Sequence, residues 1–389
     1  MKVILVDDER LALDYLERQL AKLAMDINII GKYTDPLEGR REIIARQADI
    51  VFLDINLPEL NGIELAEQIL EQKLDTQVVF VTAYDEYAVK AFELNALDYI
   101  VKPIQAERLA KTMARIKASL DTRSDEAAGS DPEYTRINMF RQVSVEMKEG
   151  RQSLLQWRTT RAQELFLYLL QHRGQLVRKS TLAEMFWPEY EHDKVYSQLY
   201  TTVYHIRKTL KPFGSRIQIV NTTEGYMMSL DQISLDTEEW EAKLAVLPHA
   251  SGDSIDDYID VMKMYAGDYL QEYDYWWAES ERQRLKNLWL EASYVIAGWY
   301  RDQALWDKAI SGYQHVCALY PLEEESHFAL MKIYASLNNS AMVEIQYNAL
   351  ETALREELNL RPSSPILDWY EAWKKSEVTA EKQAQPGSF

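Results

Sequence analysis

The first 121 residues alternate short apolar runs with longer stretches in which apolar residues recur three or four positions apart. A short continuous apolar run is typical of a strand buried on both faces, and the second pattern is typical of an amphipathic helix. Alternating strands and helices predict an α/β domain with a doubly wound parallel sheet. The five runs that we expect to form its strands lie at residues 2–7, 27–33, 49–54, 77–82 and 98–102.

Residues 134–235 follow a different pattern, after a polar stretch rich in small residues at 122–133 that we expect to be a linker. Two strand-like runs come first, and three helical patterns follow, the last and longest within residues 194–212. Two further strand-like runs then flank residues 221–225. This succession of helices, ending in a hairpin, predicts a winged helix-turn-helix domain.

Residues 236–378 show helical patterning almost throughout, and a 34-residue period appears in the second half of this segment. Tyr300 and Tyr334 are separated by this distance, as are Tyr313 and Tyr347. It is the length of a tetratricopeptide repeat, a helix pair that stacks on its neighbours and presents a concave surface suited to a protein partner. We therefore expect an all-α, repeat-like domain whose first helices cap the stack.

The composition of the 389-residue chain argues against secreted, membrane-spanning and disulfide-rich classes of protein. The N-terminus lacks the pattern of a secretory signal, and no apolar run approaches the roughly 20 residues that cross a bilayer. Cys317 is the only cysteine, which excludes a disulfide framework and a thiolate metal site. We expect a cytoplasmic protein with no membrane partner, ending in a disordered polar tail at residues 379–389.

Charge is distributed unevenly along the chain, whose net charge at pH 7 is −19. Residues 134–235 contain 14 Lys and Arg against 9 Asp and Glu, a net charge of +5. Residues 236–389 contain 13 Lys and Arg against 27 Asp and Glu, a net charge of −14. A basic segment inside an acidic protein indicates a polyanion as its partner, and for a winged helix we expect double-stranded DNA.

Polar side chains follow the predicted strands of the first domain. Asp7 and Asp8 follow the first apolar run, Asp54 ends the third, Thr82 ends the fourth and Lys102 ends the fifth. The carboxyl ends of parallel strands meet at one edge of a sheet, so we expect these side chains to lie together. Three carboxylates repel one another there, and a Mg²⁺ ion resolves the conflict. Asp54 could then be a phosphate acceptor, with Thr82 and Lys102 holding the other phosphoryl oxygens.

Residues 1–121 resemble the receiver domain of two-component response regulators, because the Asp pair at 7–8, the single Asp54, the Thr-Ala pair at 82–83 and the Lys-Pro pair at 102–103 match its motifs. The resemblance implies that a histidine kinase phosphorylates Asp54. It also implies that Asp8, Asp54 and the backbone carbonyl of Asn56 bind the Mg²⁺ ion, with Asp7 nearby, and that the peptide bond before Pro103 is cis.

The same resemblance implies two further features of receiver domains. Tyr99 occupies the position of an aromatic switch that turns inward on phosphorylation, although a packing tyrosine on the last strand explains it equally well. The face formed by about residues 84–115 is the one through which related receivers pair, so we expect a phosphorylation-promoted homodimer.

The third helical pattern of the basic segment has two sides. Leu199, Val203, Ile206 and Leu210 recur at helical spacing and should face the core. The opposite side and the end of the helix should meet DNA, through base edges early in the helix and phosphates late in it. The residues that we expect there are Ser197, Tyr200, Thr201, Tyr204, His205, Arg207, Lys208 and Lys211.

The basic segment resembles the DNA-binding domain of OmpR/PhoB-type regulators, and Glu224, Gly225 and Tyr226 fit its wing. One departure is that the third helix offers Tyr, Thr and His where that family commonly has Arg, so the base-reading residues are a hypothesis. Together with the helical segment, residues 134–375 resemble activators of the antibiotic-regulatory-protein type with their bacterial transcriptional activation domain. This resemblance implies RNA polymerase as a partner.

These features favour a phosphorylation-controlled, DNA-binding transcriptional regulator, with activation expected, and not an enzyme. One alternative keeps the DNA binding but places control in a ligand or protein bound to the helical domain. Another is an adaptor whose winged helix docks protein, against which the local positive charge argues weakly. A metabolic enzyme is least favoured, because no catalytic triad order, histidine metal cluster or Gly-rich phosphate loop is apparent.

Overall fold

The computed structural model describes most of the chain, in two compact units. The described residues are 1–23, 25–58, 60–71, 76–83, 98–126, 134–148, 150–190 and 192–384. The first unit consists of Met1–Ile137 and Ser144–Ser234, and the second of Asn138–Val143 and Leu235–Phe389. Among these residues, no helix combines the length and the apolar character that crossing a membrane requires.

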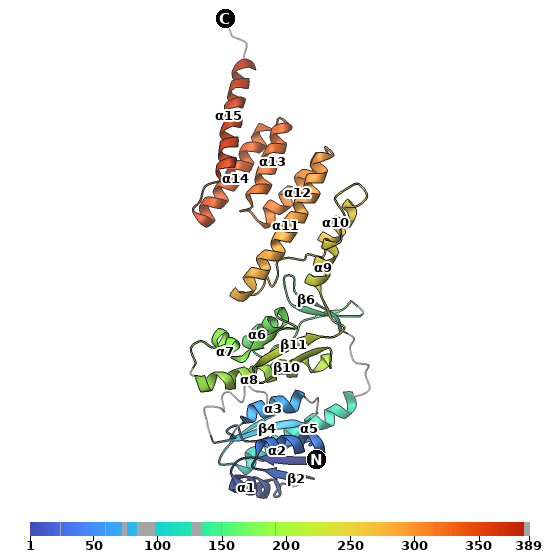
Figure 1. Ribbon diagram of the computed structural model, residues 1–389, viewed down its shortest axis with the longest axis vertical. Helices are drawn as coiled ribbons and strands as arrows, with labels where there is room; N and C mark the ends of the chain where they lie inside the picture. Colours follow the sequence, from blue (N-terminus) through green and yellow to red (C-terminus); the bar gives the residue numbers. More distant parts are fainter. Residues whose placement is uncertain are drawn as a thin grey trace. The chain divides into compact units, whose positions relative to one another are not determined.

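The N-terminal part of the first unit contains the predicted parallel sheet, drawn in blue in Figure 1. Its five strands lie in the order β2-β1-β3-β4-β5. They are β1 (Lys2–Val6), β2 (Asn28–Tyr33), β3 (Ile50–Leu53), β4 (Gln77–Thr82) and β5 (Asp98–Val101). The helices described with them are α1 (Arg10–Leu20), α2 (Pro36–Arg46), α3 (Gly62–Glu71) and α5 (Ala106–Glu126). The predicted doubly wound α/β architecture is thus confirmed.

The two faces of this sheet carry separate cores. Apolar residues of α1 and α5 pack on one face with Phe52 and Val79, and those of α2 and α3 pack on the other with Val51 and Phe80. Strands β3 and β4 are therefore covered on both sides, as their continuous apolar runs predict. Helix α5 continues to Glu126, so the prediction of a linker from residue 122 is wrong for its first five residues.

The winged helix-turn-helix follows in the first unit. Its N-terminal sheet has the order β12-β6-β7-β8, and its C-terminal sheet has the order β10-β11-β9. The strands are β6 (Tyr134–Asn138), β7 (Ser144–Met147), β8 (Gln152–Ser153), β9 (Leu176–Arg178), β10 (Ile217–Asn221), β11 (Gly225–Leu230) and β12 (Ser234–Leu235). The helices are α6 (Thr160–Gln171), α7 (Lys179–Phe186), α8 (His192–Leu210) and the short 3₁₀ helix η1 (Lys211–Phe213).

Gly225 allows strand β11 of the wing to pair closely with strand β9. The predicted hairpin is β10 and β11, and β11 also pairs with the short strand β9. A Cβ atom at Gly225 would lie 2.1 Å from the carbonyl oxygen of Val177 in β9, so only glycine permits the approach.

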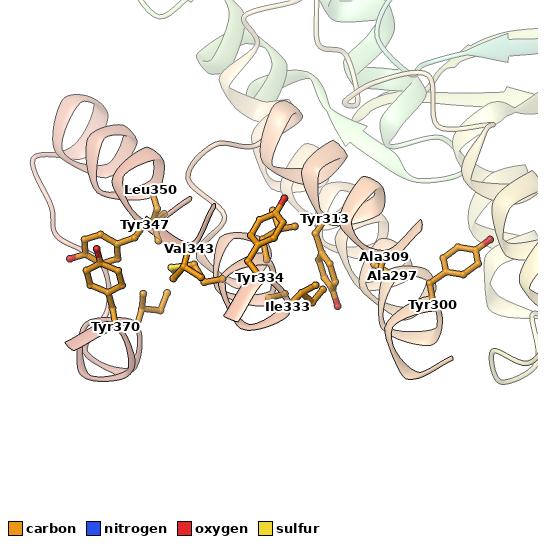
Figure 2. Close-up of a cluster of buried hydrophobic side chains, with 14 of the residues drawn as sticks. Ala297, Tyr300, Ala309, Tyr313, Ile333, Tyr334, Val343, Tyr347, Leu350 and Tyr370 are labelled. Atoms are coloured by element: carbon orange, nitrogen blue, oxygen red, sulfur yellow. The ribbon is translucent and has the colours of Figure 1, made fainter. Parts of the chain in front are cut away.

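The second unit is a stack of helices, confirming the predicted helical domain. They are α9 (Asp236–Ala245), α10 (Ile255–Met262), the 3₁₀ helix η2 (Trp276–Ala278), α11 (Glu279–Asp302), α12 (Trp306–Leu319), α13 (Glu324–Ser336), α14 (Ser340–Leu358) and α15 (Ser364–Ala384). Figure 2 shows that Tyr300, Tyr313, Tyr334 and Tyr347 lie in one buried cluster, so the 34-residue period marks equivalent core positions of stacked helix pairs.

The C-terminal end of this unit differs from the sequence-based expectation. Helix α15 extends to Ala384, so the prediction of a disordered tail is wrong for residues 379–384. Residues 385–389 lie outside the described part of the chain.

Candidate functional site

The strand pairing of the first domain brings the predicted acidic residues together. Val6 of β1 pairs with Leu53 of β3, and the backbone N–H of Asp54 donates to the carbonyl of Val6 at 2.9 Å. Asp7 and Asp54 therefore leave adjacent strands at the same edge. On the other side of β3, the N–H of Lys102 donates to the carbonyl of Thr82 at 2.8 Å, which brings the end of β5 to the same edge.

The Lys102 ammonium joins two buried carboxylates. Its Nζ atom lies 2.7 Å from Oδ2 of Asp7 and 2.8 Å from Oδ2 of Asp54. Burial raises the pKa of Asp7, although hydrogen bonds from Lys102 and from the N–H of Glu9 act in the opposite direction. Burial also disfavours the charged form of Lys102, but its hydrogen bonds to Asp54 and Asp7 outweigh this and raise its pKa. A protonated Lys102 thus compensates the charge at the tip of β3.

Three carboxylates can converge on one cation. One oxygen from each of Asp7, Asp8 and Asp54 can be chosen so that all lie within 4.8 Å of one another. Asp8 is exposed, whereas Asp7 and Asp54 are buried, so the cluster opens to solvent on one side. Hard carboxylate oxygens with open positions suit Mg²⁺ and a phosphate oxygen. The N–H of Asn56 donates to Oδ1 of Asp54 at 3.3 Å, which places the backbone of Asn56 beside the cluster.

Thr82 contributes an unsatisfied hydroxyl to this region. Its side chain is fully buried, and Oγ1 has no hydrogen-bond partner among the described residues. A buried hydroxyl without a partner costs about 1–3 kcal/mol. Such a cost is typical of a group whose partner is supplied by a ligand.

Other predictions about this domain have mixed outcomes. The Lys102–Pro103 peptide bond is cis, as the family resemblance implies. Tyr99 pairs through its backbone with Phe80, but its side chain lies outside the described residues, so its role as a switch stays a prediction. The predicted pairing face also stays a prediction, because residues 84–97 lie outside the described part of the chain.

The core-facing side of α8 is as predicted. Leu199, Val203, Ile206 and Leu210 are all buried. Lys208 and Lys211 are exposed, as a phosphate contact requires. Arg207 is half-buried. Its guanidinium donates to the carbonyl of Ile219 at 2.8 Å, so this side chain joins α8 to β10.

The opposite side of α8 differs from the expectation. Thr201, Tyr204 and His205 are buried, so the prediction that they are exposed is wrong, and burial raises the pKa of Tyr204 to about 12. Tyr200 is half-buried, and the side chain of Ser197 lies outside the described residues. The role of these residues in reading bases stays a prediction.

Lys179 is a buried cation that the sequence patterns do not single out. Its ammonium lies 5.1 Å from the ring centre of Tyr200, 5.6 Å from that of Tyr226 and 3.7 Å from a carboxylate oxygen of Glu64. In the sequence, Lys179 is one of several basic residues near a helix start, so no local pattern marks it.

Three family models match this chain in the order of its domains. The model described as response regulator receiver domain matches residues 3–114. The model described as transcriptional regulatory protein, C terminal, matches residues 156–228, and the model described as bacterial transcriptional activator domain matches residues 249–372. These matches confirm the three resemblances drawn from the sequence.

Curated relatives match the receiver region. An uncharacterized response regulatory protein of Vibrio cholerae is 46% identical over 116 residues, which are 30% of this chain and 48% of the relative. The transcriptional regulatory protein BtsR of Escherichia coli is 42% identical over 117 residues, again 30% of this chain and 48% of the relative. The chain thus spans about half the length of the curated relatives it matches.

A solved receiver structure also matches this chain. The response regulatory domain of protein mrkE from Klebsiella pneumoniae is 36% identical in sequence, with a TM-score of 0.29. The match covers 31% of this chain and 99% of that one.

Proposed function

Because this chain is a response regulator with DNA-binding and transcription-activation domains, we propose that a histidine kinase phosphorylates Asp54 and thereby controls its action on transcription. The observation that carries the proposal is the contact of Lys102 with Asp7 and Asp54, 2.7 and 2.8 Å long, in a pocket that also holds an unpartnered Thr82 hydroxyl. An ionised carboxylate held by a cation is poised as a nucleophile.

The proposed transfer uses an oxygen of Asp54 as the nucleophile. It attacks the phosphorus of a phosphohistidine or of a small acyl phosphate, the bond to the leaving group breaks, and an aspartyl phosphate forms. Lys102 and Thr82 stabilise two of the phosphoryl oxygens. Asp7, Asp8, Asp54 and the Asn56 carbonyl would hold Mg²⁺, which when bound neutralises charge on the transferring group.

The protein would bind DNA through its basic winged-helix domain. Its net charge of +5 and the exposed Lys208 and Lys211 support a phosphate-contacting surface at the end of α8. Two winged helices would reach paired half-sites in a homodimer. The helical domain would contact RNA polymerase, which remains a proposal from the activator resemblance alone.

Footprinting on the DNA upstream of the protein's own gene tests this function. With Mg²⁺ and acetyl phosphate, we expect protection at a protein concentration at least about tenfold lower than without them, because phosphorylation should raise the DNA-binding population. EDTA should remove the effect by removing the metal. Equal protection under all three conditions would contradict phosphate control but not DNA binding.

Lys208→Ala should weaken binding to cognate and random DNA alike. Removing one phosphate contact should lower the slope of log affinity against log salt concentration by about one unit. Lys263→Ala is the matched control, because it removes the same charge from an exposed residue that directly follows α10, outside the DNA-binding domain. Binding titrations at four salt concentrations measure both slopes. An unchanged slope for Lys208→Ala would exclude a phosphate contact at this position.

A further inference from the structure

The first unit contains a cavity of about 630 Å³ whose lining comes from both of its domains. Helices α2 and α3 of the receiver form one part of the lining, and the start of α7, Tyr200 of α8 and residues 221–223 at the end of β10 form the rest. Sites for small organic molecules typically have volumes of roughly 300–1,000 Å³. The cavity therefore has room for an organic ligand and not only for an ion.

The lining has an excess of positive charge. Among the described residues that form it, the charged ones are Arg40, Arg41, Lys179 and Glu64, a net charge of +2. The Nη1 atom of Arg40 donates to the amide oxygen of Gln68 at 2.6 Å, which fixes this guanidinium at the cavity wall. In a protein whose net charge is −19, a local group of cations favours a ligand that carries at least two negative charges.

Lys179 lacks a hydrogen-bond acceptor among the described residues, although it is only 7% exposed. The carboxylate oxygen of Glu64 lies 3.7 Å from its ammonium, which is longer than a hydrogen bond. Its other contacts are with the rings of Tyr200 and Tyr226, which attract a cation but are weak acceptors. Burying an ammonium without acceptors is unfavourable, so an anionic oxygen bound in the cavity would stabilise it.

The lining changes from cationic to apolar along α2. Arg40 and Ile44 are four residues apart, as are Arg41 and Ala45, so the members of each pair lie on one side of the helix, about 6 Å apart along its axis. The Nε atom of Arg41 donates to the carbonyl of Leu37, which directs its guanidinium away from Ala45. A phosphate bound at the arginines therefore leaves an apolar strip for another part of the same ligand.

The winged helix adds hydroxyl groups to the lining through Thr222 and Thr223. The Thr222 hydroxyl is already engaged, because it donates to the carbonyl of Gly225 and accepts from its N–H, both at 3.0 Å. The exposed Thr223 hydroxyl can donate to or accept from a hydroxyl of a ligand. Cations, an apolar strip and a hydroxyl are groups that recognise the phosphates, the base and the sugar of a nucleotide.

We infer that this cavity is a binding site for a small phosphorylated ligand, a nucleoside diphosphate in chemical class. Its phosphates contact Arg40, Arg41 and Lys179, and its base lies along the apolar strip of α2. The carboxylate cluster at Asp54 does not line the cavity, so the site is independent of the proposed phosphoryl transfer. Ligand binding there would make the protein sensitive to the concentration of a nucleotide, separately from its phosphorylation.

Isothermal titration calorimetry of the full-length protein with the four common ribonucleoside 5′-diphosphates tests the site. EDTA is present, so that no Mg²⁺ ion at the carboxylate cluster can recruit phosphate. We expect at least one of the four to bind with a Kd below about 1 mM, and its nucleoside to bind at least about tenfold more weakly for lack of charge. Failure of all four to bind, or equal affinity for the nucleoside, would overturn the inference.

Inorganic pyrophosphate tests the apolar strip in the same way. It should bind at least about tenfold more weakly than the diphosphate that binds best, because it leaves the apolar strip in contact with water. Pyrophosphate that binds as tightly as the nucleotide would show that the cavity recognises phosphate alone, and would overturn the assignment to a nucleotide.

Arg41→Ala should weaken binding of that diphosphate at least about fivefold, because it removes a charge-assisted contact to phosphate. Arg41 is exposed, so its replacement should leave the fold intact. Arg18→Ala is the matched control, because it removes the same charge from an exposed position on α1, which packs on the opposite face of the receiver sheet from α2. Equal losses in the two variants would indicate general charge attraction and exclude the site.

DNA is the other source of phosphate oxygens for these cations, and the Arg41→Ala variant distinguishes the two. Its affinity for a random-sequence duplex should stay within about twofold of that of the unaltered protein, because Arg41 belongs to the receiver and not to the DNA-binding domain. If the affinities for DNA and for the diphosphate fall by the same factor, the cations belong to the DNA-binding surface and the inference is wrong.

Discussion

Asp54→Asn should abolish phosphorylation of this protein. With Mg²⁺ and acetyl phosphate, the unaltered chain should gain one acid-stable, base-labile phosphoryl group, and the variant should be labelled at least about 100-fold more slowly. The neutral amide offers no anionic nucleophile, while the contacts of Lys102 and the fold around β3 remain. Intact-mass spectrometry over a time course measures the rate.

Asp26→Asn serves as the control for this experiment. Asp26 is exposed, lies in the same domain and is not part of the carboxylate cluster, so the variant loses one negative charge without touching the pocket. It should be labelled as fast as the unaltered protein. Full labelling of Asp54→Asn would place the phosphate acceptor elsewhere.

The second large effect concerns the stability of the helical unit. Asp236 is buried at the first turn of α9, where its Oδ1 atom accepts from the N–H of Met139 at 2.7 Å and its Oδ2 atom from that of Phe140 at 3.1 Å. These bonds hold Phe140 in edge-to-face contact with Trp240 at 5.6 Å. Asp236→Ala removes the acceptor of these two buried N–H groups and of the N–H of Thr237, which donates to Oδ1 at 2.8 Å, so we expect it to destabilise the unit by about 3 kcal/mol.

Calorimetry of the full-length protein should detect this loss in the transition of the helical unit, as a fall in Tm of roughly 6–12 °C. Asp256→Ala provides the comparison, because Asp256 is also an acidic residue in the first turn of a helix but is exposed. Its replacement should change the unfolding free energy by less than about 0.5 kcal/mol. Equal shifts for the two variants would show that the buried hydrogen bonds contribute nothing beyond the helix dipole.

The sequence by itself determined the elements whose signal is local and periodic. Strands β3 and β4 are buried on both faces, so their apolar runs stand out, and the polar residue that ends each run marks the edge where the pocket forms. Asp54 and Lys102 were predictable for this reason, 48 residues apart in sequence and in contact in the structure. The 34-residue period likewise predicts equivalent core tyrosines, since stacked helix pairs repeat their packing.

Only the tertiary structure decided the features that depend on contacts between distant segments. Strand β9 has three residues, too few to show a period, and it exists because β11 pairs with it. In the sequence, Asp236 is one of many acidic residues at the start of a helix. Its hydrogen bond to Met139 forms only because the segment Asn138–Val143 packs with the helical unit in the folded protein. The polar side of α8 predicts exposure, yet Thr201 and Tyr204 on that side are buried. The spacing of apolar residues along a helix predicts which side packs on the core. It does not predict that another element will cover the polar side, because polar residues show the same spacing whether they are covered or exposed.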